Sequence, residues 1–304
     1  MIRTLKWLSV VSTIGMIFIL IGGALVTKTD SGMGCGSTWP LCNGQIIPKE
    51  ITAELIIEYS HRLVSTVIGV TVLLLAILAW KHIGHIKEVK FLASLSVIFL
   101  VLQGLIGAAA VMWGQSDFVL ALHFGISLVS FAAVFILMLL IFEIDKKFDT
   151  LSLNIQKKHR IEIYSLIIYT IIVVYTGALV RHVNANLVCP DWPFCYNDKP
   201  FMIAELNFYQ IVQMGHRFFA GILFLWTIVF FIKIWKHYRH NKMMYIGWLV
   251  TLILITSQVI SGAFIIFSQL NLWIALLHAF FITCYFGSLS YFVLLSFRSA
   301  RRTN

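Results

Sequence analysis

Long, uninterrupted apolar segments constrain this chain more than any other feature of its sequence. The hydrocarbon layer of a membrane is about 30 Å thick and a helix rises about 1.5 Å per residue, so a crossing helix needs roughly 20 apolar residues. Eight segments meet this requirement, at approximately 7–27, 62–80, 91–112, 120–142, 163–181, 216–235, 245–267 and 275–297. Only 12% of the residues are charged, against roughly 25% in soluble domains. The sequence therefore predicts an all-α membrane protein with eight transmembrane helices.

The distribution of positive charge predicts the orientation of these helices. With the N-terminus in the cytoplasm, most of the 23 Lys and Arg residues fall in segments on the cytoplasmic side, where such residues are usually in excess. We therefore expect a multi-pass protein of the cell (plasma) membrane with both termini cytoplasmic. The net charge of +10 reflects this topology, and its distribution argues against nucleic acid as a partner.

An internal repeat runs through the chain. The segment GALVTKTDSGMGCGSTWPLC at 23–42 resembles GALVRHVNANLVCPDWPFC at 177–195. HRLVSTVIG at 61–69 resembles HRFFAGILF at 216–224, and QGLIGAAAV at 103–111 resembles QVISGAFII at 258–266. The later matches share one offset of about 155 residues, which chance rarely produces across separate helices. The chain is therefore expected to consist of two similar halves.

Each half contains four predicted spans. Because this number is even, both halves insert in the same direction, related by a pseudo-two-fold axis along the membrane normal. We predict two four-helix bundles. The N-terminal half covers 1–145, a polar cytoplasmic linker covers 146–162, and the C-terminal half covers 163–304.

Four of the ten histidines obey the repeat and lie in apolar surroundings at the outer ends of spans: His61, His123, His216 and His278. A histidine inside a span is costly and indicates function by default, although a hydrogen bond between helices is the alternative. Zinc is a poor fit, because it takes three or four ligands with help from thiolate or carboxylate. Two facing imidazoles suit the axial positions of a haem iron. We therefore predict one pocket from His61 with His123 and a second from His216 with His278.

The other six histidines lie at helix ends or in loops: His82, His85, His159, His182, His237 and His240. For these we expect interfacial or solvated side chains.

The halves differ at one position beside the first histidine of each pair. The first half reads Glu58-Tyr-Ser-His61-Arg62, and the second reads Gln213-Met-Gly-His216-Arg217. Residues three apart share a helical face, so Glu58 is expected to face the same pocket as His61. The alternative is a surface carboxylate at the end of an outer loop. A pocket-facing Glu58 could move protons or stabilise positive charge on a substrate.

Four of the five cysteines lie in outer segments. Cys35 and Cys42 are in the first outer segment, and Cys189 and Cys195 are in the third. Disulfides persist outside the cytosol, so both pairs lie where they could oxidise. Cys284 lies inside a span, where a small buried apolar residue is expected.

Together these residues resemble the bacterial haem A synthase family. The EYSHR segment, the TWPLC and DWPFC loops and the four histidines all match, and the resemblance covers essentially the whole chain. It implies oxidation of the C8 methyl group of haem O to a formyl group, through two hydroxylations with oxygen from water. An unidentified electron acceptor is required, and the enzyme that makes haem O is a possible partner.

The resemblance also implies roles for individual residues. His61 and His123 would ligate substrate haem in the N-terminal half, and His216 and His278 would ligate haem B in the C-terminal half. Glu58 would act at the substrate methyl group. Cys35–Cys42 would be the loop pair associated with function, and Cys189–Cys195 the corresponding second pair. Arg62 and Arg217 could pair with haem propionates, or their side chains could extend to the membrane interface.

Two other functions compete with this interpretation. A membrane cytochrome with two bis-histidine haems could exchange electrons with quinone, but it would leave the difference between Glu58 and Gln213 without a use. A transporter would also explain a duplicated bundle. It would be expected to have broken helices and binding residues at mid-membrane, whereas the polar residues here gather at the outer ends.

Overall fold

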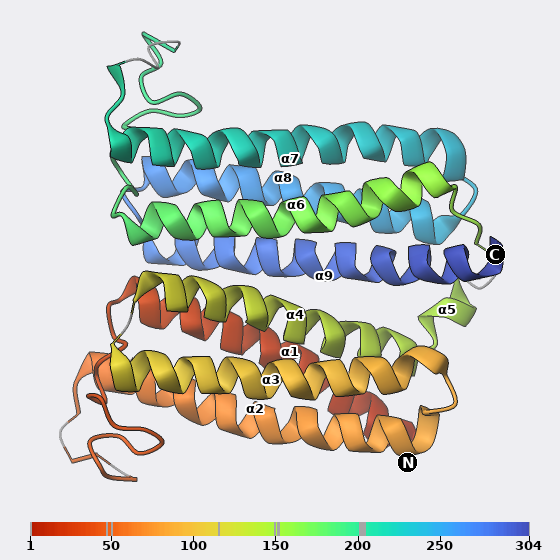
Figure 1. Ribbon diagram of the computed structural model, residues 1–304, viewed down its shortest axis with the longest axis horizontal. Helices are drawn as coiled ribbons and strands as arrows, with labels where there is room; N and C mark the ends of the chain where they lie inside the picture. The colour runs from red at the N-terminus through yellow and green to blue at the C-terminus, as the bar shows by residue number, and fades with distance from the viewer. Residues whose placement is uncertain are drawn as a thin grey trace. The chain divides into compact units, whose positions relative to one another are not determined.

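The computed structural model describes residues 2–46, 48–49, 51–114, 116–148, 150, 153–200 and 205–303. In these ranges the chain forms helices and contains no β-strand, as Figure 1 shows. The helices are α1 (Ile2–Lys28), α2 (Ala53–Ile83), α3 (Lys87–Trp113), α4 (Asp117–Ile141), α5 (Ile144–Lys147), α6 (Lys157–His182), α7 (Phe208–Tyr238), α8 (Lys242–Phe267) and α9 (Leu272–Thr303). Eight of them are long and apolar enough to cross a membrane. The predicted all-α fold with eight spans is confirmed.

The helices extend beyond the predicted apolar segments because polar residues cap them. Thr52 caps α2 by accepting a hydrogen bond from the Leu55 N–H at 3.2 Å. Asn207 caps α7 through a capping box with Gln210, in which each side chain accepts from the other residue's backbone N–H. Such caps satisfy N–H groups that the first turn of a helix leaves without partners. As a result, the segments around His61 and His216 are helical well before each histidine.

The chain divides into two compact units, Met1–Ile144 and Asp145–Asn304. In the first unit, α1 and α3 each pack against both α2 and α4, so α2 and α4 lie across one diagonal of the bundle. In the second unit, α6 and α8 pack in the same way against α7 and α9. The two helices that carry histidines in each unit therefore face each other across the bundle interior.

The segment expected as a linker, 146–162, falls within the second unit and contains more structure than a linker. Helix α6 already begins at Lys157. The residues just before it bind α9 and α7. The Ile155 N–H donates to Ser299 Oγ at 2.8 Å, and the Gln156 N–H donates to Tyr238 Oη at 3.0 Å. Polar composition indicated a linker here, but it could not show that backbone groups bind these two side chains.

His159 corrects the expectation of a solvated side chain. It lies in the first turn of α6 and is only 1% exposed. Its Nδ1 is 3.0 Å from Tyr238 Oη, and its ring packs edge-on against Phe230. Because α6 begins earlier than the apolar segment, this histidine faces α7 instead of the interface. Among the others, His85, His237 and His240 are exposed and His82 is partly buried; the side chain of His182 lies outside the described residues.

Aromatic packing fills the interior of the second unit away from the histidines. Trp248 is fully buried, with its ring centroid 4.6 Å from Phe230 and 4.7 Å from Phe292. Helices in lipid associate mainly through close packing, because the lipid is as apolar as the side chains. These large rings therefore fix the approach of α7, α8 and α9.

Candidate functional site

A disulfide closes the loop that follows α1 in the first unit and the loop that follows α6 in the second. Cys35 pairs with Cys42 and Cys189 pairs with Cys195, and three of these four residues are completely buried. Each loop also contains a cis Trp-Pro bond, at Trp39-Pro40 and at Trp192-Pro193. Both loops lie directly before the helix that carries Glu58 or Gln213.

Glu58 is buried and binds the first of these loops. It is 3% exposed, and its Oε2 accepts a hydrogen bond from the Cys35 N–H at 2.7 Å. Its other oxygen forms an ion pair with Arg62, one helical turn further along α2. Arg62 in turn donates to the carbonyl oxygens of Thr38 at 2.7 Å and Leu41 at 3.1 Å. The alternative of an exposed surface carboxylate is therefore wrong.

Gln213 occupies the equivalent position in the second unit. Its Oε1 accepts from the Cys189 N–H at 2.8 Å, and its Nε2 donates to the Asn186 carbonyl at 2.7 Å. Glu58 and Gln213 thus make the same hydrogen bond to the first cysteine of each pair. The structural difference between the halves is a negative charge on one side and a neutral amide on the other.

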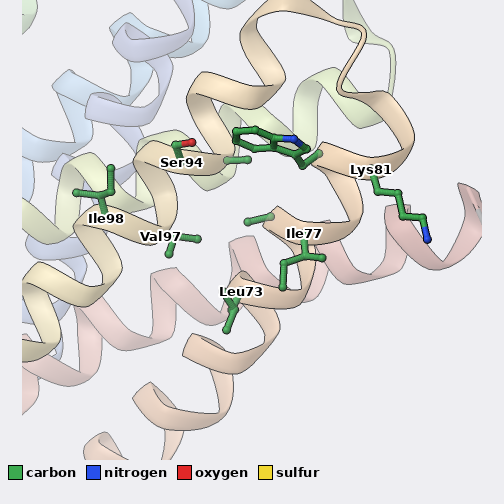
Figure 2. A pocket seen from close by; sticks show the side chains of 9 residues that line it. Leu73, Ile77, Lys81, Ser94, Val97 and Ile98 are labelled. Carbon is green, nitrogen blue, oxygen red and sulfur yellow. The ribbon is translucent and has the colours of Figure 1, made fainter.

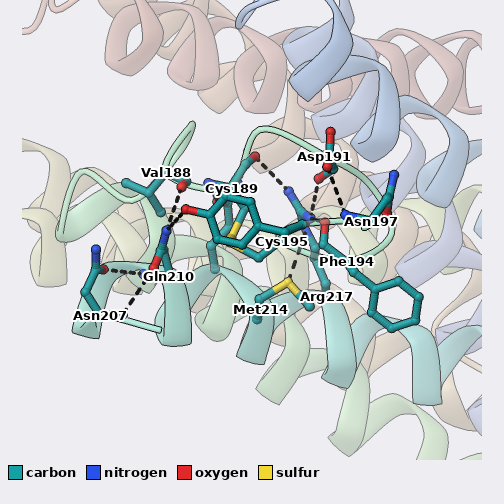
Figure 3. Close-up of a disulfide and its surroundings, with 12 residues drawn as sticks. Val188, Cys189, Asp191, Phe194, Cys195, Asn197, Asn207, Gln210, Met214 and Arg217 are labelled. Atoms are coloured by element: carbon teal, nitrogen blue, oxygen red, sulfur yellow. Dashed lines mark hydrogen bonds between the residues drawn. A yellow bond between two sulfur atoms is a disulfide. The ribbon is translucent and has the colours of Figure 1, made fainter. Parts of the chain in front are cut away.

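Arg217 binds the second loop through backbone carbonyl groups, as Figure 3 shows. Its Nη1 donates to the Asp191 oxygen at 2.6 Å and to the Phe194 oxygen at 3.0 Å. Arg62 and Arg217 therefore both hold a loop against a helix, a role that the sequence reasoning missed. The i, i+4 spacing of Glu58 and Arg62 was the available sequence signal for this role in the first unit.

A glycine of the preceding helix lies against each histidine of the first unit. The His61 ring on α2 packs on α1, where a Cβ added to Gly22 would lie 2.9 Å from its Nδ1. The His123 ring on α4 packs on α3, where a Cβ on Gly107 would lie 3.3 Å from its Cε1. Because glycine has no side chain, each imidazole can pack directly against the backbone at these two positions.

The second unit repeats this arrangement. A Cβ on Gly177 of α6 would lie 2.9 Å from Cε1 of His216, and one on Gly262 of α8 would lie 3.1 Å from Cε1 of His278. The four glycine–histidine contacts were missed from the sequence. Gly107 and Gly262 do occupy matching places in the repeated QGLIGAAAV and QVISGAFII segments, which was a usable signal.

Several buried polar atoms in the described ranges lack hydrogen-bond partners, and most of them lie on a histidine or within one helical turn of a histidine or its facing glycine; Trp248 Nε1 and Ser296 Oγ lie elsewhere. Among the described residues, buried atoms without a hydrogen-bond partner include Ser65 Oγ, Gln103 Oε1 and His123 Nδ1 in the first unit and Gln258 Oε1 in the second. Buried polar atoms are normally paired. A group of orphaned donors and acceptors beside two imidazoles fits a site built for a polar or metal-bearing ligand. The donor set, one imidazole from each of two diagonal helices, suits a haem iron.

A separate apolar groove lies between α2 and α3. Leu73, Ile77, Val97 and Ile98 line it, and Lys81 stands at its edge, as Figure 2 shows. Its volume is about 560 Å³. Since α2 runs from Ala53 to Ile83, the groove lies toward the opposite end of this helix from His61. No histidine contributes to it, so it is distinct from the candidate site.

The chain is similar to known proteins over nearly its whole length. The family model of the cytochrome oxidase assembly proteins, COX15-CtaA, matches residues 6–290. The haem A synthase of Geobacillus kaustophilus is 59% identical over 98% of this chain and 93% of its own length. That of Oceanobacillus iheyensis is 60% identical over 99% of this chain and 98% of its own length. A haem A synthase of Bacillus cereus is 51% identical over 98% of this chain and 94% of its own length.

Proposed function

Because the chain belongs to the COX15-CtaA family of cytochrome oxidase assembly proteins, we propose that it works as a haem A synthase and converts haem O to haem A. The reaction oxidises a methyl group of the porphyrin, at C8, to a formyl group. Two hydroxylations each take one water and release two electrons and two protons. The resulting geminal diol loses water to leave the formyl group, and the four electrons pass to an acceptor that remains to be identified.

The membrane suits this substrate. Haem O is a large apolar molecule with a farnesyl tail, and a site among membrane-spanning helices can accept it directly from lipid. We place the protein in the cell membrane with both termini cytoplasmic, as the distribution of Lys and Arg favours. The disulfide loops then face the oxidising side. We propose that the enzyme that makes haem O is the donor and docks in the same membrane.

We assign the substrate site to the N-terminal unit and a resident haem B to the C-terminal unit. His61 and His123 would hold the substrate iron, and His216 and His278 would hold haem B. The resident haem would supply one-electron transfer. The glycines opposite each ring and the orphaned polar atoms near them support two such sites.

One observation carries the assignment of chemistry to the N-terminal unit. The C-terminal loop makes its hydrogen bond to Cys189 with the neutral amide of Gln213. A negative charge is therefore not needed to hold a loop of this kind. We therefore assign the charge of the buried Glu58 carboxylate to the reaction, where it would stabilise positive charge developing at the substrate methyl group and accept a proton.

Arg62 and Arg217 lie one residue beyond a histidine of each pair, and we propose that each contacts a haem propionate. A guanidinium has five N–H donors in a planar fork that matches a carboxylate. Each arginine would then join three partners: its helix, the disulfide loop and the haem. This arrangement would let the loop sense whether haem is present.

Glu58→Gln tests the proposed function, since it gives the N-terminal unit the amide that the C-terminal unit already has. We expect normal protein level and haem binding, but a fall in haem A formation of at least about 100-fold, the scale typical of a lost acid–base or electrostatic group. Haems extracted from membranes and separated by chromatography give the measurement. Gln213→Glu is the matched control and should leave haem A formation largely intact.

The result that would contradict this assignment is undiminished haem A formation by Glu58→Gln at normal protein level. If instead the unchanged protein carried two equivalent haem B groups and made no haem A, the alternative would hold. That alternative is a bis-histidine cytochrome exchanging electrons with quinone, and the matching histidine pairs of the two units favour it over any other competitor.

A further inference from the structure

The two histidines of the C-terminal unit each have a hydroxyl group at Nδ1. Thr176 Oγ1 on α6 is 2.9 Å from Nδ1 of His216. Ser261 Oγ on α8 is 3.0 Å from Nδ1 of His278. In both cases the hydroxyl comes from the helix that also supplies the facing glycine, and it is the residue directly before that glycine.

These hydroxyl groups fix the direction of the hydrogen bonds. Thr176 donates its only proton to the Val173 carbonyl at 2.7 Å, and Ser261 donates its own to the Gln258 carbonyl at 2.9 Å. Each oxygen can then only accept from the ring, so each Nδ1 carries the hydrogen. The His278 Nδ1 is also 3.1 Å from the Gln258 carbonyl oxygen, which can only accept.

This tautomer leaves the Nε2 lone pair of both rings available to a metal. At His278, the Nε2 atom is 2.9 Å from the side-chain amide nitrogen of Gln258, which donates to it. If His278 held an iron through this nitrogen, the Gln258 amide would have to move aside. Ligating histidines usually donate their second N–H to such a partner, which orients the ring and raises its basicity.

The N-terminal unit lacks both hydroxyl groups. The repeat aligns Thr176 with Gly22, and it aligns Ser261 with Ile106. Gly22 has no side chain to offer His61. The His123 ring faces the Gln103 backbone carbonyl, as the His278 ring faces the Gln258 carbonyl, but among the described residues no hydroxyl group reaches the buried Nδ1 of His123. Gln103 and Gln258 occupy matching positions and are identical, so the glutamines do not distinguish the units.

We propose that Thr176 and Ser261 are positioning residues that make the C-terminal haem resident, and that Gly22 and Ile106 leave the N-terminal ligands loose enough to exchange substrate for product. The inference rests on the proposed function, because it assumes that each histidine pair holds a haem. An enzyme that modifies haem must release it after each reaction cycle, whereas a redox cofactor must stay. The hydroxyl groups supply a physical cause for this difference in residence time.

The test compares variants that differ only in the hydroxyl. Thr176→Val keeps the shape and removes the hydroxyl, whereas Thr176→Ser keeps it. Both are made in full-length protein with His61→Ala and His123→Ala, so that only the C-terminal pocket retains ligands. The purified protein is loaded with haem B, and its transfer to excess apomyoglobin is followed. We expect at least about 10-fold faster loss from Thr176→Val, the lower end of the effect of such partners on metal affinity.

The reduction potential of the bound haem is a second measurement. Loss of the hydrogen bond should change this potential in one direction, whereas a general packing defect has no preferred direction. A hydrogen bond from Nδ1 makes the imidazole a stronger donor and favours ferric iron, so Thr176→Val should raise the potential and Thr176→Ser should not. Should Thr176→Val fail to accumulate, Ser261→Ala and Ser261→Thr repeat the comparison at His278. Equal rates and potentials for the hydroxyl-bearing and hydroxyl-free variants overturn the proposal.

The reciprocal change adds a hydroxyl to the N-terminal unit. Ile106→Ser, in protein with His216→Ala and His278→Ala, should slow haem loss from the first pocket about 10-fold relative to Ile106→Ala, which also shortens the side chain but adds no hydroxyl group. In the otherwise unchanged protein, Ile106→Ser should also retain more haem O and haem A. Equal loss from the serine and alanine variants would contradict the proposal.

Different results would contradict the haem sites and the role of the hydroxyl groups. If the unchanged protein takes up no haem, or if replacing either histidine pair leaves haem content the same, the haem sites themselves are wrong. If haem binds through both pairs but the hydroxyl groups change neither residence nor potential, only the present inference fails.

Discussion

At the scale of single residues, the four histidines depend on what lies opposite them. Each ring packs on a glycine of the preceding helix, and the space is tightest at Gly22 and Gly177. Histidines at repeated positions were recognisable from sequence, because ionisable groups are rare in membrane spans. The facing glycines were not, since glycine is common in such helices for many reasons and only the structure shows which ones meet a ring.

Gly177→Ala tests this contact in the C-terminal unit. The new methyl group would lie 2.9 Å from Cε1 and 3.3 Å from Nε2 of His216, so the ring must turn from its position. We expect weaker haem binding by about 10-fold, as for other changes that disturb a ligand's orientation, together with an altered absorption spectrum. Haem titration and spectroscopy of the purified protein provide the measurement.

Gly221→Ala is the control for this substitution. Gly221 lies on α7, and a Cβ there would meet nothing within 4 Å. Both substitutions gain the same helix propensity, about 1 kcal/mol. If the two variants bound haem alike, contact with the His216 ring would not limit the site.

At the scale of elements, a helix and the disulfide loop before it form one assembly in each unit. Glu58 and Arg62 hold the first loop through an ion pair and backbone hydrogen bonds. Gln213 and Arg217 hold the second loop without an ion pair between them. Helix lengths and loop cysteines could be predicted from apolar runs and spacing. The loop contacts could not, because they join side chains to backbone atoms whose positions depend on the folded loop.

A double-mutant cycle measures this difference between the units. Removing Arg62 alone leaves the Glu58 carboxylate buried without its partner, which costs about 3 kcal/mol. Arg62→Gln should therefore be much less harmful when combined with Glu58→Gln, giving a coupling free energy of at least about 1 kcal/mol. Unfolding by dodecyl sulfate in mixed micelles provides the free energies.

The second unit supplies the comparison for this cycle. Gln213→Leu and Arg217→Gln remove the corresponding groups, and we expect a coupling near zero because Gln213 is neutral and Arg217 binds carbonyl oxygens. Similar coupling in both units would mean that the ion pair adds nothing to the way in which Glu58 and Arg62 hold their loop.

At the scale of the whole molecule, the two units share one arrangement of helices and loops but differ at residues of the candidate site. Both units place histidines on diagonal helices, and both hold a disulfide loop at the same place in the chain. The apolar segments and the repeat predicted this much, because each depends on patterns that a single sequence displays. The asymmetry is carried by a few residues, Glu58 against Gln213 above all, and its meaning depends on contacts that spacing alone does not reveal.

The orientation of the molecule in the membrane gives the last prediction. Lys and Arg gather in the segments that we place in the cytoplasm, so the disulfide loops should face outward. In intact cells, an impermeant maleimide should label a cysteine placed at the exposed Lys199, just after the loop closed by Cys189 and Cys195. A cysteine placed at the exposed His240, in the turn between α7 and α8, should react only after the cells are permeabilised. Labelling of the His240→Cys protein in intact cells would reverse the proposed topology and put the reaction site on the cytoplasmic side.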